Sequence, residues 1–526
     1  MTDRAIRQPS FGGSIARGDR SGDGLRSAIR KTLIVASVFL AVPFAATSAS
    51  AFDWKTIANS DTLIPGTAKT FSSFNQPSIS NKCFVTFRAR GTGPSSPPRG
   101  VYYVKLCKKK KKQTIKKLYA AGDKVPWPNN SNAPFTEFPS FSRVDITSNF
   151  IASRGQSQPV WTYTTPSGDT KVGTAGVYYA RRKMLNPRTG ASLLGSVPGF
   201  WYFSVPDFPG KRFDQFPGAP VPFDKKYIAF KGNYSETVGV TTVSRTGVYF
   251  RQIYKGAKRR IKKIADSHTR IPGGTTTFGS TAPPSAAKGA VVFLGLDDED
   301  NPTQGGIYRS KIKRPTKLRT LIGIGDKVPG AKKQRFTHFG EGLSYDGELL
   351  AFWGAWGPQM RDVKLYCPVD GNADLIAECH VQCPDVDAGG NYCMRQVPYN
   401  QGIFVRRADG QFRQVASTRE KRGDYEDFLY WVFSGRPPSV GDPGAEPPRW
   451  RSSAFVAATP NGEDSASVVF KGTRRDNKEG LFIRHMHKKR IKPILLVGAD
   501  VRTVDRRAPG SGIPRSFLHS HCLTSF

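Results

Sequence analysis

The apolar residues of this chain come in short β-type runs separated by turn residues. Glycine and proline, at 53 and 39 of 526 residues, punctuate the sequence. The runs are rich in β-branched and aromatic side chains and are bounded by turn signals, which favours strands over helices. The pattern therefore predicts an all-β protein built from many short antiparallel strands.

The strands belong to an internal repeat. A run that ends in an aromatic or small residue, such as YIAFKG at 227–232, occurs six times. After a variable loop comes a second run that begins with glycine, as in GVYF at 247–250. Repeats of this kind indicate a solenoid, a propeller or an array. The aromatic residue of the second run falls at Tyr102, Tyr178, Tyr249, Tyr308, Phe404 and Phe482.

Two further elements complete the repeat. A run such as LRTLIGIGDKVPG, at 318–330, follows most of the glycine-aromatic runs, and an F-x-x-F pair such as Phe213 with Phe216 precedes the first run in several repeats. Four β-type runs per repeat match the four antiparallel strands of a propeller blade. We therefore expect a β-propeller of six four-stranded blades with long inter-strand loops.

The number of blades and the closure stay open. An extra copy of the third element, at 54–66, precedes the first repeat. This copy allows a seventh blade, or an N-terminal strand that completes the last blade. An open stack of β units and a pair of separate β-sandwiches are the alternative architectures.

One segment resembles a known repeat. GLSYDGELLAF, at 342–352, is similar to the S-x-D-G-x-x-[IL]-A-F pattern of TolB-like propeller repeats. The full unit, with I-A-D-x-x-x-x-I-P-G, F-x-x-F, V-A-F-x-G and G-I-Y, resembles exported bacterial tandem-repeat proteins of unknown function with TolB-like or WD-type β-propeller repeats. Some of those carry a PEP-CTERM sorting tail, which is not recognisable here, and repeats two and six are degenerate. The resemblance implies an architecture and no activity.

The first 51 residues have the pattern of an export signal. Basic residues up to Lys31 precede a short apolar run at 32–46, and Ala49-Ser50-Ala51 forms a small-residue cleavage site before Phe52. A membrane anchor is the alternative, although fifteen apolar residues are short for a bilayer. We expect a secreted or periplasmic protein without a transmembrane anchor. The expected division is a leader and signal peptide at 1–51, a propeller domain at 52–510 with a cysteine-containing insertion loop at 354–402, and a tail at 511–526.

Seven cysteines follow the export signal, and export makes disulfides their default state. Two disulfides are expected within one loop, from Cys367, Cys379, Cys383 and Cys393. Cys83 and Cys107 are candidates for a third bridge, and Cys522 is left over. Zinc is less favoured because the gaps of 12, 4 and 10 residues do not form paired short spacings. The connectivity stays open. Calcium ligation by Asp385, Asp387 and Asn391 is the alternative to plain turn acids.

The positive charge is concentrated at one position of the repeat. The chain has 79 basic and 41 acidic residues, a net charge of +38. Six segments that directly follow the glycine-aromatic runs hold 33 basic residues and one acid, Asp409. These segments lie at 105–117, 181–188, 251–263, 309–319, 406–413 and 484–492. In a four-stranded blade this position is the hairpin between the third and outermost strands, so a basic ring is expected on one face.

Such a ring would attract anionic polymers or an anionic cell surface through salt-dependent contacts. The alternative is that solvated lysine-rich turns simply protect the outer edge strands from pairing. The candidate polyanion-binding residues are Lys108, Lys109, Lys110, Lys111, Lys112, Lys116, Lys117, Lys258, Arg259, Arg260, Lys262, Lys263, Lys311, Lys313, Arg314, Lys488, Lys489 and Arg490.

Catalytic motifs are absent from the sequence. It contains no H-E-x-x-H, no G-x-S-x-G and no P-loop. His485 and His487 fall on one face of a strand, but no third metal ligand is indicated. We therefore expect no catalytic residue, metal or cofactor, and a non-enzymatic binding or scaffold propeller. The alternative is a propeller hydrolase or lyase acting on an extracellular polymer, which carboxylates around the channel mouth would favour. A structural module with a protein partner at the long loops is the third possibility.

Overall fold

The computed structural model describes residues 54–93, 97–107, 113–125, 134–165, 168–181, 192–195, 205–209, 211, 213–253, 260–331, 333–369, 373–419, 425–434, 448–461, 465–500 and 504–505. The chain divides into two units, Met1–Phe52 and Asp53–Phe526, and all of these residues belong to the second. They form 32 strands and one helix, α1 (Ala373–Gln382), which confirms the all-β expectation. The expected export signal and the start at Phe52 lie outside the described residues.

Three antiparallel sheets make up the N-terminal half of the second unit. Sheet 1 comprises β1 (Phe71–Phe74), β2 (Ser78–Ile79), β3 (Phe84–Gly91), β4 (Arg99–Lys105) and β5 (Lys116–Ala120). Sheet 2 comprises β6 (Phe135–Glu137), β7 (Arg143–Val144), β8 (Phe150–Thr165), β9 (Gly168–Arg181) and β10 (Ser192–Gly195). Sheet 3 comprises β11 (Val221–Phe223), β12 (Tyr227–Val238), β13 (Thr241–Gln252) and β14 (Lys262–Asp266).

Three more sheets follow. Sheet 4 comprises β15 (Ser280–Thr281), β16 (Ser285–Ala287), β17 (Ala290–Leu296), β18 (Gly305–Lys311) and β19 (Arg314–Gly323). Sheet 5 comprises β20 (Phe336–Phe339), β21 (Ser344–Tyr345), β22 (Leu349–Tyr366), β23 (Asp385–Asp387), β24 (Gly390–Arg407) and β25 (Phe412–Ser417). Sheet 6 comprises β26 (Tyr425–Asp427), β29 (Val456–Pro460), β30 (Ala466–Arg474), β31 (Glu479–His485) and β32 (Ile491–Leu496). A separate ribbon pairs β27 (Leu429–Ser434) with β28 (Arg449–Ala454).

Each sheet is a four-stranded meander whose strands pair in chain order. In most sheets the first strand is interrupted into two pieces that pair with the same second strand, as β1 and β2 both pair with β3. In sheets 1, 2 and 5 the F-x-x-F pair supplies the first piece of the first strand, whereas in sheet 3 it precedes β11 and flanks the isolated bridge between Gln215 and Asn233. We call the connections within a sheet its first, second and third turns, in chain order. Because neighbouring strands are antiparallel, the first and third turns lie at one end of each sheet and the second turn lies at the other.

Three sequence expectations need correction. Residues 54–66 form no strand, because their only pairing is the isolated bridge between Leu63 and Thr70, and sheet 6 has its own fourth strand in β32. The variable loops at 153–176 and 232–247 are mostly strand, since β8–β9 and β12–β13 continue as long hairpins. The insertion loop expected at 354–402 is also shorter, because β22 and β24 pair as far as Tyr366 and Tyr392.

The recurring glycine and aromatic positions of the repeat are explained by two aromatic rings that pack over facing glycines. In five sheets a glycine of the second strand lies directly opposite a glycine of the third strand, as Gly232 lies opposite Gly247. A Cβ added at Gly232 would lie 2.5 Å from the ring of Phe213. The missing side chains therefore make room for two rings, one from the third strand and one that lies in the first strand or just before it, as Phe213 and Phe278 do. In sheet 1 the pair is Ala89 with Gly100.

The two rings meet edge to face in all six sheets, with centroids 4.8–5.3 Å apart and interplanar angles of 73–89°. This is the geometry that aromatic quadrupoles favour. The pairs are Phe71–Tyr102, Phe135–Tyr178, Phe213–Tyr249, Phe278–Tyr308, Phe336–Phe404 and Tyr425–Phe482. In five sheets the pairing between the third and fourth strands shifts register at the third-strand residue just before the ring. A β-bulge at this position is therefore part of the repeat.

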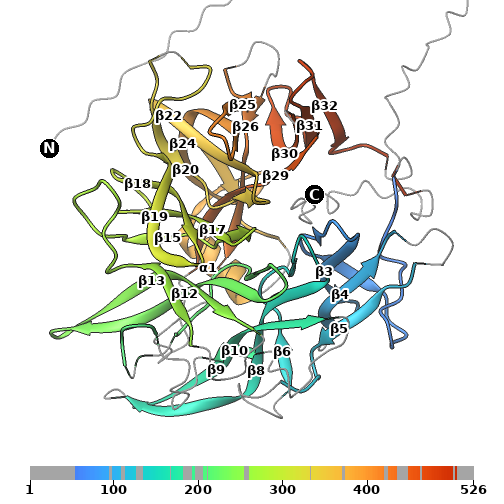
Figure 1. Ribbon diagram of the computed structural model, residues 1–526. Coiled ribbons are helices and arrows are strands. Elements are labelled where there is room, and N and C mark those ends of the chain that lie inside the picture. The colour runs from blue at the N-terminus through green and yellow to red at the C-terminus, as the bar shows by residue number, and fades with distance from the viewer. Residues whose placement is uncertain are drawn as a thin grey trace, which may run out of the picture. The chain divides into compact units, whose positions relative to one another are not determined.

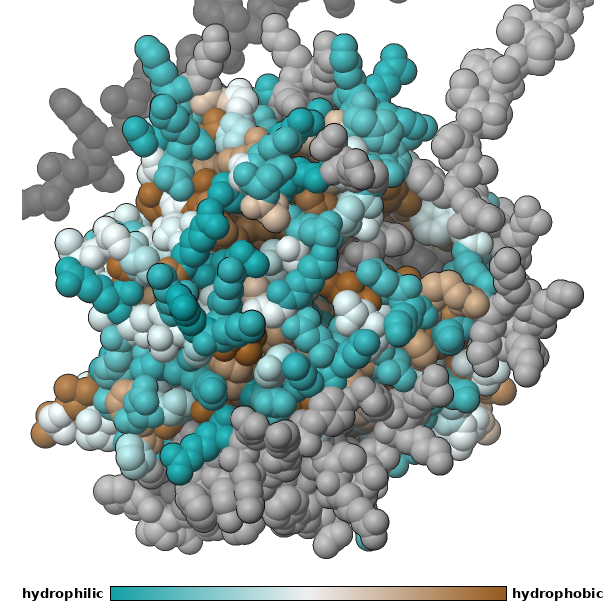
Figure 2. Space-filling view, in the orientation of Figure 1, coloured by the Kyte–Doolittle hydropathy of each residue, from teal (hydrophilic) through white to brown (hydrophobic). Residues whose placement is uncertain are grey.

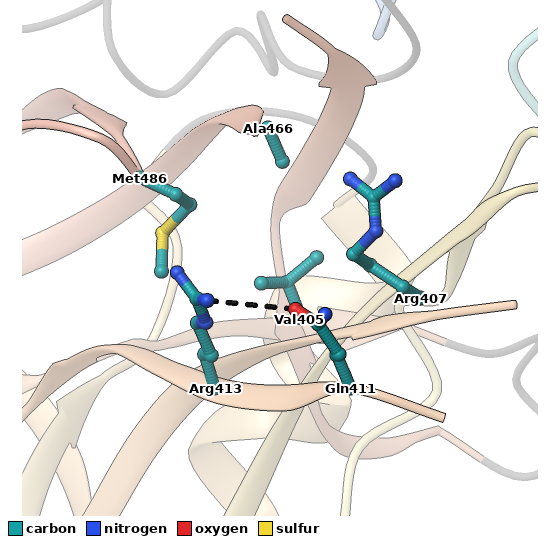
Figure 3. Close-up of a pocket in the computed structure, with 6 residues that line it drawn as sticks. All are labelled: Val405, Arg407, Gln411, Arg413, Ala466 and Met486. Carbon is teal, nitrogen blue, oxygen red and sulfur yellow. Dashed lines mark hydrogen bonds between the residues drawn. The ribbon is translucent and has the colours of Figure 1, made fainter. Parts of the chain in front are cut away.

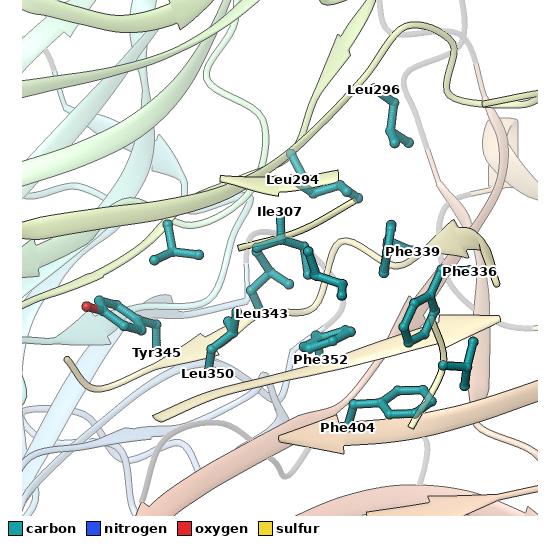
Figure 4. Packing of buried hydrophobic residues seen from close by; sticks show 14 of the residues in the cluster. Leu294, Leu296, Ile307, Phe336, Phe339, Leu343, Tyr345, Leu350, Phe352 and Phe404 are labelled. Atoms are coloured by element: carbon teal, nitrogen blue, oxygen red, sulfur yellow. The ribbon is translucent and has the colours of Figure 1, made fainter. Parts of the chain in front are cut away.

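Hydrophobic cores lie between consecutive sheets. One core joins Leu294 and Ile307 of sheet 4 to Phe336, Phe352 and Phe404 of sheet 5, and Figure 4 shows these side chains converging from the two sheets. Equivalent cores join sheets 1 and 2, 2 and 3, 3 and 4, and 5 and 6. Figure 1 shows the colour advancing from sheet to sheet in the same order. Face-to-face packing of this kind buries both sides of most sheets.

The two ends of the described unit meet. The side-chain amide of Asn59, before sheet 1, donates a 2.9 Å hydrogen bond to the carboxylate of Asp505, after sheet 6. Among the described residues, no helix is long and apolar enough to cross a membrane.

The glycine–aromatic arrangement gives the first prediction. Gly232→Ala should lower the free energy of unfolding by about 1–3 kcal/mol, because the new methyl group overpacks the buried ring of Phe213. The midpoint of urea denaturation measures this change. Val240→Ala, at a fully exposed position, is the control and should shift stability by less than about 0.5 kcal/mol. Equal midpoints for the two variants would contradict this explanation of the repeat.

Candidate functional site

The basic segments fall at the third turn of the sheets and on the strands beside it. Lys311, Lys313 and Arg314 flank the tight turn between β18 and β19. Lys488, Lys489 and Arg490 form the turn between β31 and β32. These basic residues thus lie between the third and fourth strands of their sheets, as the sequence predicted.

Direct contacts show that the third turns lie beside the first turns. In sheet 1 the Cys83–Cys107 disulfide joins the two turns, with Cα atoms 5.6 Å apart. In sheet 3 the amide of Ile253 donates to the carbonyl of Lys226 at 2.8 Å, and in sheet 4 the amide of Ile312 donates to the carbonyl of Gly289 at 3.0 Å. In sheet 6 the Met486 amide donates to the carbonyl of Ala466 at 2.8 Å.

The first turns of successive sheets also contact one another. The amide of Asn81 in sheet 1 donates to the carbonyl of Ile146 in sheet 2 at 2.8 Å. The Asp145 carboxylate then accepts from the Lys225 amide, and the Asp224 carboxylate accepts from the Gly289 amide, each at 2.7 Å. Lys288 of sheet 4 forms an ion pair with Glu348 of sheet 5. A chain of contacts therefore connects the same end of sheets 1 to 5.

Eleven of the predicted cations are among the described residues, and ten of these are exposed. Lys263 is half-buried and pairs with Asp207 and Asp266, and Lys117 pairs with Asp123. The other nine have no carboxylate partner within the described part of the chain. These nine are Lys116, Arg260, Lys262, Lys311, Lys313, Arg314, Lys488, Lys489 and Arg490. The remaining candidates, Lys108, Lys109, Lys110, Lys111, Lys112, Lys258 and Arg259, lie outside the described residues.

A small hollow separates the third turns of sheets 5 and 6 (Figure 3). Val405, Ala466 and Met486 give it an apolar wall, whereas Arg407, Arg413 and Gln411 bring polar groups to it. Arg413 donates to the side-chain oxygen of Gln411 at 3.4 Å, and Arg407 lies 3.6 Å from Asp409. Sequence reasoning placed 406–413 among the basic segments but gave no reason to single out these two arginines.

His485 and His487 lie at the third turn of sheet 6, between β31 and β32. Their ring centroids are 5.8 Å apart, and each Nδ1 lies within hydrogen-bond distance of a serine hydroxyl: Ser467 for His485 and Ser465 for His487. Partial burial and the charge of Lys488 lower the pKa of His485. No acidic or cysteine side chain completes a metal site around this pair within the described residues.

The insertion of sheet 5 is held by two disulfides, Cys367–Cys379 and Cys383–Cys393, with Cα atoms 5.9 and 4.7 Å apart. The two bridges join helix α1 to the ends of β22 and β24 and pack against Phe433 and Trp450 of the separate ribbon. The sulfurs of Cys367, Cys379 and Cys383 lie within 4.8 Å of one another, which is close enough to share a metal ion. All three sulfurs are bonded in the two disulfides. The insertion therefore has a small core of its own.

Two of the three residues weighed as calcium ligands, Asp387 and Asn391, have protein partners. Asp387 binds Lys364 and the hydroxyl of Tyr366 and accepts from the amide of Gly389. The amide group of Asn391 donates to the carbonyl of Cys383 at 3.1 Å. Asp385 is exposed on the short strand β23. The contacts of Asp387 and Asn391 stabilise the insertion.

Exposed apolar side chains collect at the second-turn end. Of the twelve large exposed hydrophobic residues in the described part of the chain, seven lie in the β22–β24 insertion. They are Met360, Tyr366, Val369, Val381, Val386, Met394 and Tyr399. Val238 and Val240 are exposed at the tip of the β12–β13 hairpin, where Figure 2 shows hydrophobic residues beside a largely hydrophilic surface. The two ends of the sheets thus differ in chemical character.

One carboxylate that the sequence did not single out lies among charges from three sheets. Glu341 sits in the interruption of the first strand of sheet 5, and the next residue, Gly342, abuts the carbonyl of Ala454. Burial raises the pKa of Glu341, and the charges that act on it are those of Lys231, Glu299, Arg451 and Arg449. Arg449 forms an ion pair with Glu299 at 3.0 Å. A carboxyl of raised pKa near a paired carboxylate is an arrangement that acid–base chemistry can use.

A second unpredicted cluster joins sheets 1 and 2. Arg88, Arg90 and Arg99 all contact Glu137, at 3.0, 2.9 and 2.9 Å. Burial would raise the pKa of Glu137, but Arg88, Arg90 and hydrogen bonds to its carboxylate outweigh it and hold the pKa at about 2. The carboxylate is already bound by three guanidinium groups, so the cluster serves to join the sheets.

No protein-family model matches the sequence, and no curated protein matches it. Among solved structures, the chain is similar to the polysaccharide lyase Uly1, with 11% identity, a TM-score of 0.29 and 55% of each chain covered. It is also similar to an acylaminoacyl peptidase from Pyrococcus horikoshii, with 9% identity, a TM-score of 0.31, and 81% of this chain and 52% of that chain covered. A third similar structure is an α-L-arabinofuranosidase from Fusarium graminearum, with 9% identity, a TM-score of 0.23, and 79% of this chain and 94% of that chain covered.

The chain thus spans about half the length of the first two of these structures. Identities and scores this low carry no inference about what the chain binds or catalyses.

The disulfide pairing gives the second prediction. Cys367→Ser with Cys379→Ser removes one whole bridge and should leave the number of free thiols unchanged from the parent. Cys367→Ser with Cys383→Ser, the matched control, breaks both bridges and should expose two additional thiols. Thiol titration of the denatured, unreduced proteins measures the difference. The reverse outcome would establish another pairing, and four free thiols or stoichiometric zinc in the parent would refute disulfides in this insertion.

Proposed function

We propose that this protein is an exported six-bladed β-propeller that binds anionic polymers through the basic third turns of its blades. The observation that carries the proposal is the chain of contacts between the first turns of sheets 1 to 5, together with the contacts from first to third turns. Because the third turns of sheets 1, 3, 4 and 6 contact the first turns of their own sheets, their basic segments lie at the same end of the strands as those first turns. Six meanders packed in chain order, with the ends of the unit in contact, support the propeller.

The electrostatics of this end favour a polyanion. Nine described lysines and arginines of these segments are exposed and have no carboxylate partner in the described part of the chain, so they stay free to bind external anions. Cations clustered on one surface raise the local concentration of anionic ligands and speed their association. Three disulfides suit the oxidising environment of an exported protein.

The second candidate function is hydrolysis or lyase cleavage of an extracellular polymer. Glu341 favours it, because burial raises the pKa of this carboxyl while Glu299 nearby is held by Arg449. A carboxyl of raised pKa is the kind of group that can serve as a general acid.

Activity assays separate this second function from binding alone. If it is correct, the parent should release new ends from an acidic polysaccharide, and Glu341→Gln should lower the rate by at least about a hundredfold. Asp476→Asn, in the exposed second turn of sheet 6, should leave the rate unchanged. Release of reducing ends reports hydrolysis, and absorbance of an unsaturated product reports a lyase. No product from the parent with any acidic polymer, or equal rates for the two variants, would leave binding as the only function.

The basic turns give the prediction that tests the main function. Replacing Lys311, Lys313 and Arg314 with Ser should weaken heparin binding about tenfold at low salt and reduce the salt dependence, because fewer counterions are released. Removing Lys108, Lys109, Lys110, Lys111 and Lys112 as well should weaken it further. The matched control replaces Lys69, Lys124 and Lys327, three exposed lysines at the other end of the sheets. Titrations at several salt concentrations measure both quantities.

The control removes the same charge from the other end, so it separates local contacts from net charge. The control variant should bind within about twofold of the parent, since screening confines each charge to its surroundings. Equal losses in the two triple variants would show that only the net charge matters. Parental affinity in the first variant would refute binding at these turns.

A further inference from the structure

The two disulfides of the sheet 5 insertion lie against each other. The sulfurs of Cys367, Cys379 and Cys383 lie within 4.8 Å of one another, although Cys383 belongs to the second bridge. Cys393, which is bonded to Cys383, adds a fourth sulfur to the same cluster. The gaps of 12, 4 and 10 residues do not indicate this cluster, because only the folding of the insertion brings the two pairs together.

A helix end and two strand ends position the four sulfurs. Cys379 lies in the last turn of α1, and the amide of Cys383 donates to its carbonyl at 2.8 Å, so these two residues stand one helical turn apart. Cys393 lies on β24, and the amide of Cys367, directly after β22, donates to the carbonyl of Asn391 at 2.8 Å. The cluster therefore takes two cysteines from a helix end and two from neighbouring strand ends.

The cluster is shielded from solvent and has a hydrogen-bond donor beside it. Cys367 is 6% exposed, and Cys379 and Cys383 are fully buried. Phe433 and Trp450 of the separate ribbon pack against them. The indole N–H of Trp450 donates to Sγ of Cys383 at 3.3 Å. Hydrogen bonds of this kind are typical of the outer shell that orients and tunes metal ligands.

We propose that the insertion, once its two disulfides are reduced, holds one Zn²⁺ ion in a tetrahedral site of four cysteine thiolates. Thiolates are soft ligands that suit zinc, and four of them without an open position form a structural site. With Zn–S bonds of about 2.3 Å, neighbouring sulfurs of the tetrahedron lie about 3.8 Å apart. Sulfurs that already lie within 4.8 Å of one another reach this arrangement by side-chain rotation. The ligands are Cys367, Cys379, Cys383 and Cys393.

Redox chemistry controls this site. Each disulfide takes up two electrons and two protons from two molecules of a thiol reductant, which leave as a disulfide of their own. Zn²⁺ then displaces the four thiol protons and binds the four thiolates. An oxidant reverses both steps, because it removes two electrons for each disulfide that forms and thereby releases the ion. An oxidising environment thus keeps the disulfides, and a reducing one converts the same insertion into a metal site.

Metal analysis of the reduced full chain tests the assignment. After reduction with a phosphine, incubation with Zn²⁺ and gel filtration, the protein should retain one zinc ion per chain. Co²⁺ in its place should give the thiolate-to-metal charge-transfer absorption and the intense visible bands of a tetrahedral site. Cys383→Ser with Cys393→Ser should weaken zinc binding at least about a hundredfold, since even the loss of an outer-shell partner costs about 10–100-fold.

Two further variants make the test specific. The matched control, Cys83→Ser with Cys107→Ser, removes the disulfide of sheet 1 and should still retain one zinc ion. Trp450→Phe keeps an aromatic ring against Phe433 but removes the N–H donor, so it should weaken zinc binding about tenfold without changing the cobalt bands to those of another geometry.

The remaining outcomes decide against the site. A reduced parent that retains no zinc, whether or not its sheets stay folded, would overturn it. Equal zinc content in the parent and in Cys383→Ser with Cys393→Ser would assign the metal to other residues and overturn it as well. Oxidation of the zinc form should release the ion as four thiols disappear, and zinc that stays bound after their loss would contradict the exchange.

Discussion

The fold depends on one contact that recurs in every sheet, the edge-to-face meeting of a third-strand ring with a ring in the first strand or just before it. The rings fit because glycines face each other on the second and third strands beneath them in five of the six sheets. The fourth strand contributes at the same place, because in five sheets its β-bulge lies beside the third-strand ring. All four strands of these sheets therefore meet around the aromatic pair. The loops are then free to vary in length and charge without loss of the core.

That constraint explains how the charge can be so one-sided. The aromatic pair fixes the register of each meander, and the register fixes which turns emerge at which end. The third turns can therefore carry many lysines and arginines in surface positions where self-repulsion costs little, because solvent screens it. The opposite end holds the long hairpins and the disulfide-bonded insertion with its exposed apolar residues. Polymer binding and any partner of the insertion would use separate surfaces.

The sequence predicted the four-strand unit because glycine and aromatic residues recur at fixed offsets and the chain order of the strands is simple. It missed the aromatic of sheet 6 because Tyr425 replaces the first phenylalanine of F-x-x-F. It also called sheet 2 degenerate, since Ser153 stands where other repeats have phenylalanine. There Tyr119 of sheet 1 bonds to Ser153 and lies against Phe135, so a neighbouring sheet fills the space.

The lengths of β8 and β12 were harder to predict, because Gly, Ser and Thr weaken the alternation beyond the core. Glu341 was missed for a different reason. Its local surroundings are two glycines, and its charged neighbours Lys231, Glu299, Arg449 and Arg451 come from segments about 40 to 110 residues away, which only the packing of sheets brings together. Pairwise disulfide connectivity was likewise open, because proximity in sequence allowed more than one pairing.

The central claim is that a polyanion binds across the basic third turns at one end of the sheets. Amide hydrogen exchange with and without heparin tests it most directly, because local protection reports where the ligand lies. If the polyanion binds there, exchange should slow in the first and third turns of several sheets, including residues 312–313 and 486–490, and stay unchanged in the insertion at 367–389. Protection confined to the insertion or the second turns, or no protection at saturating heparin, would contradict it.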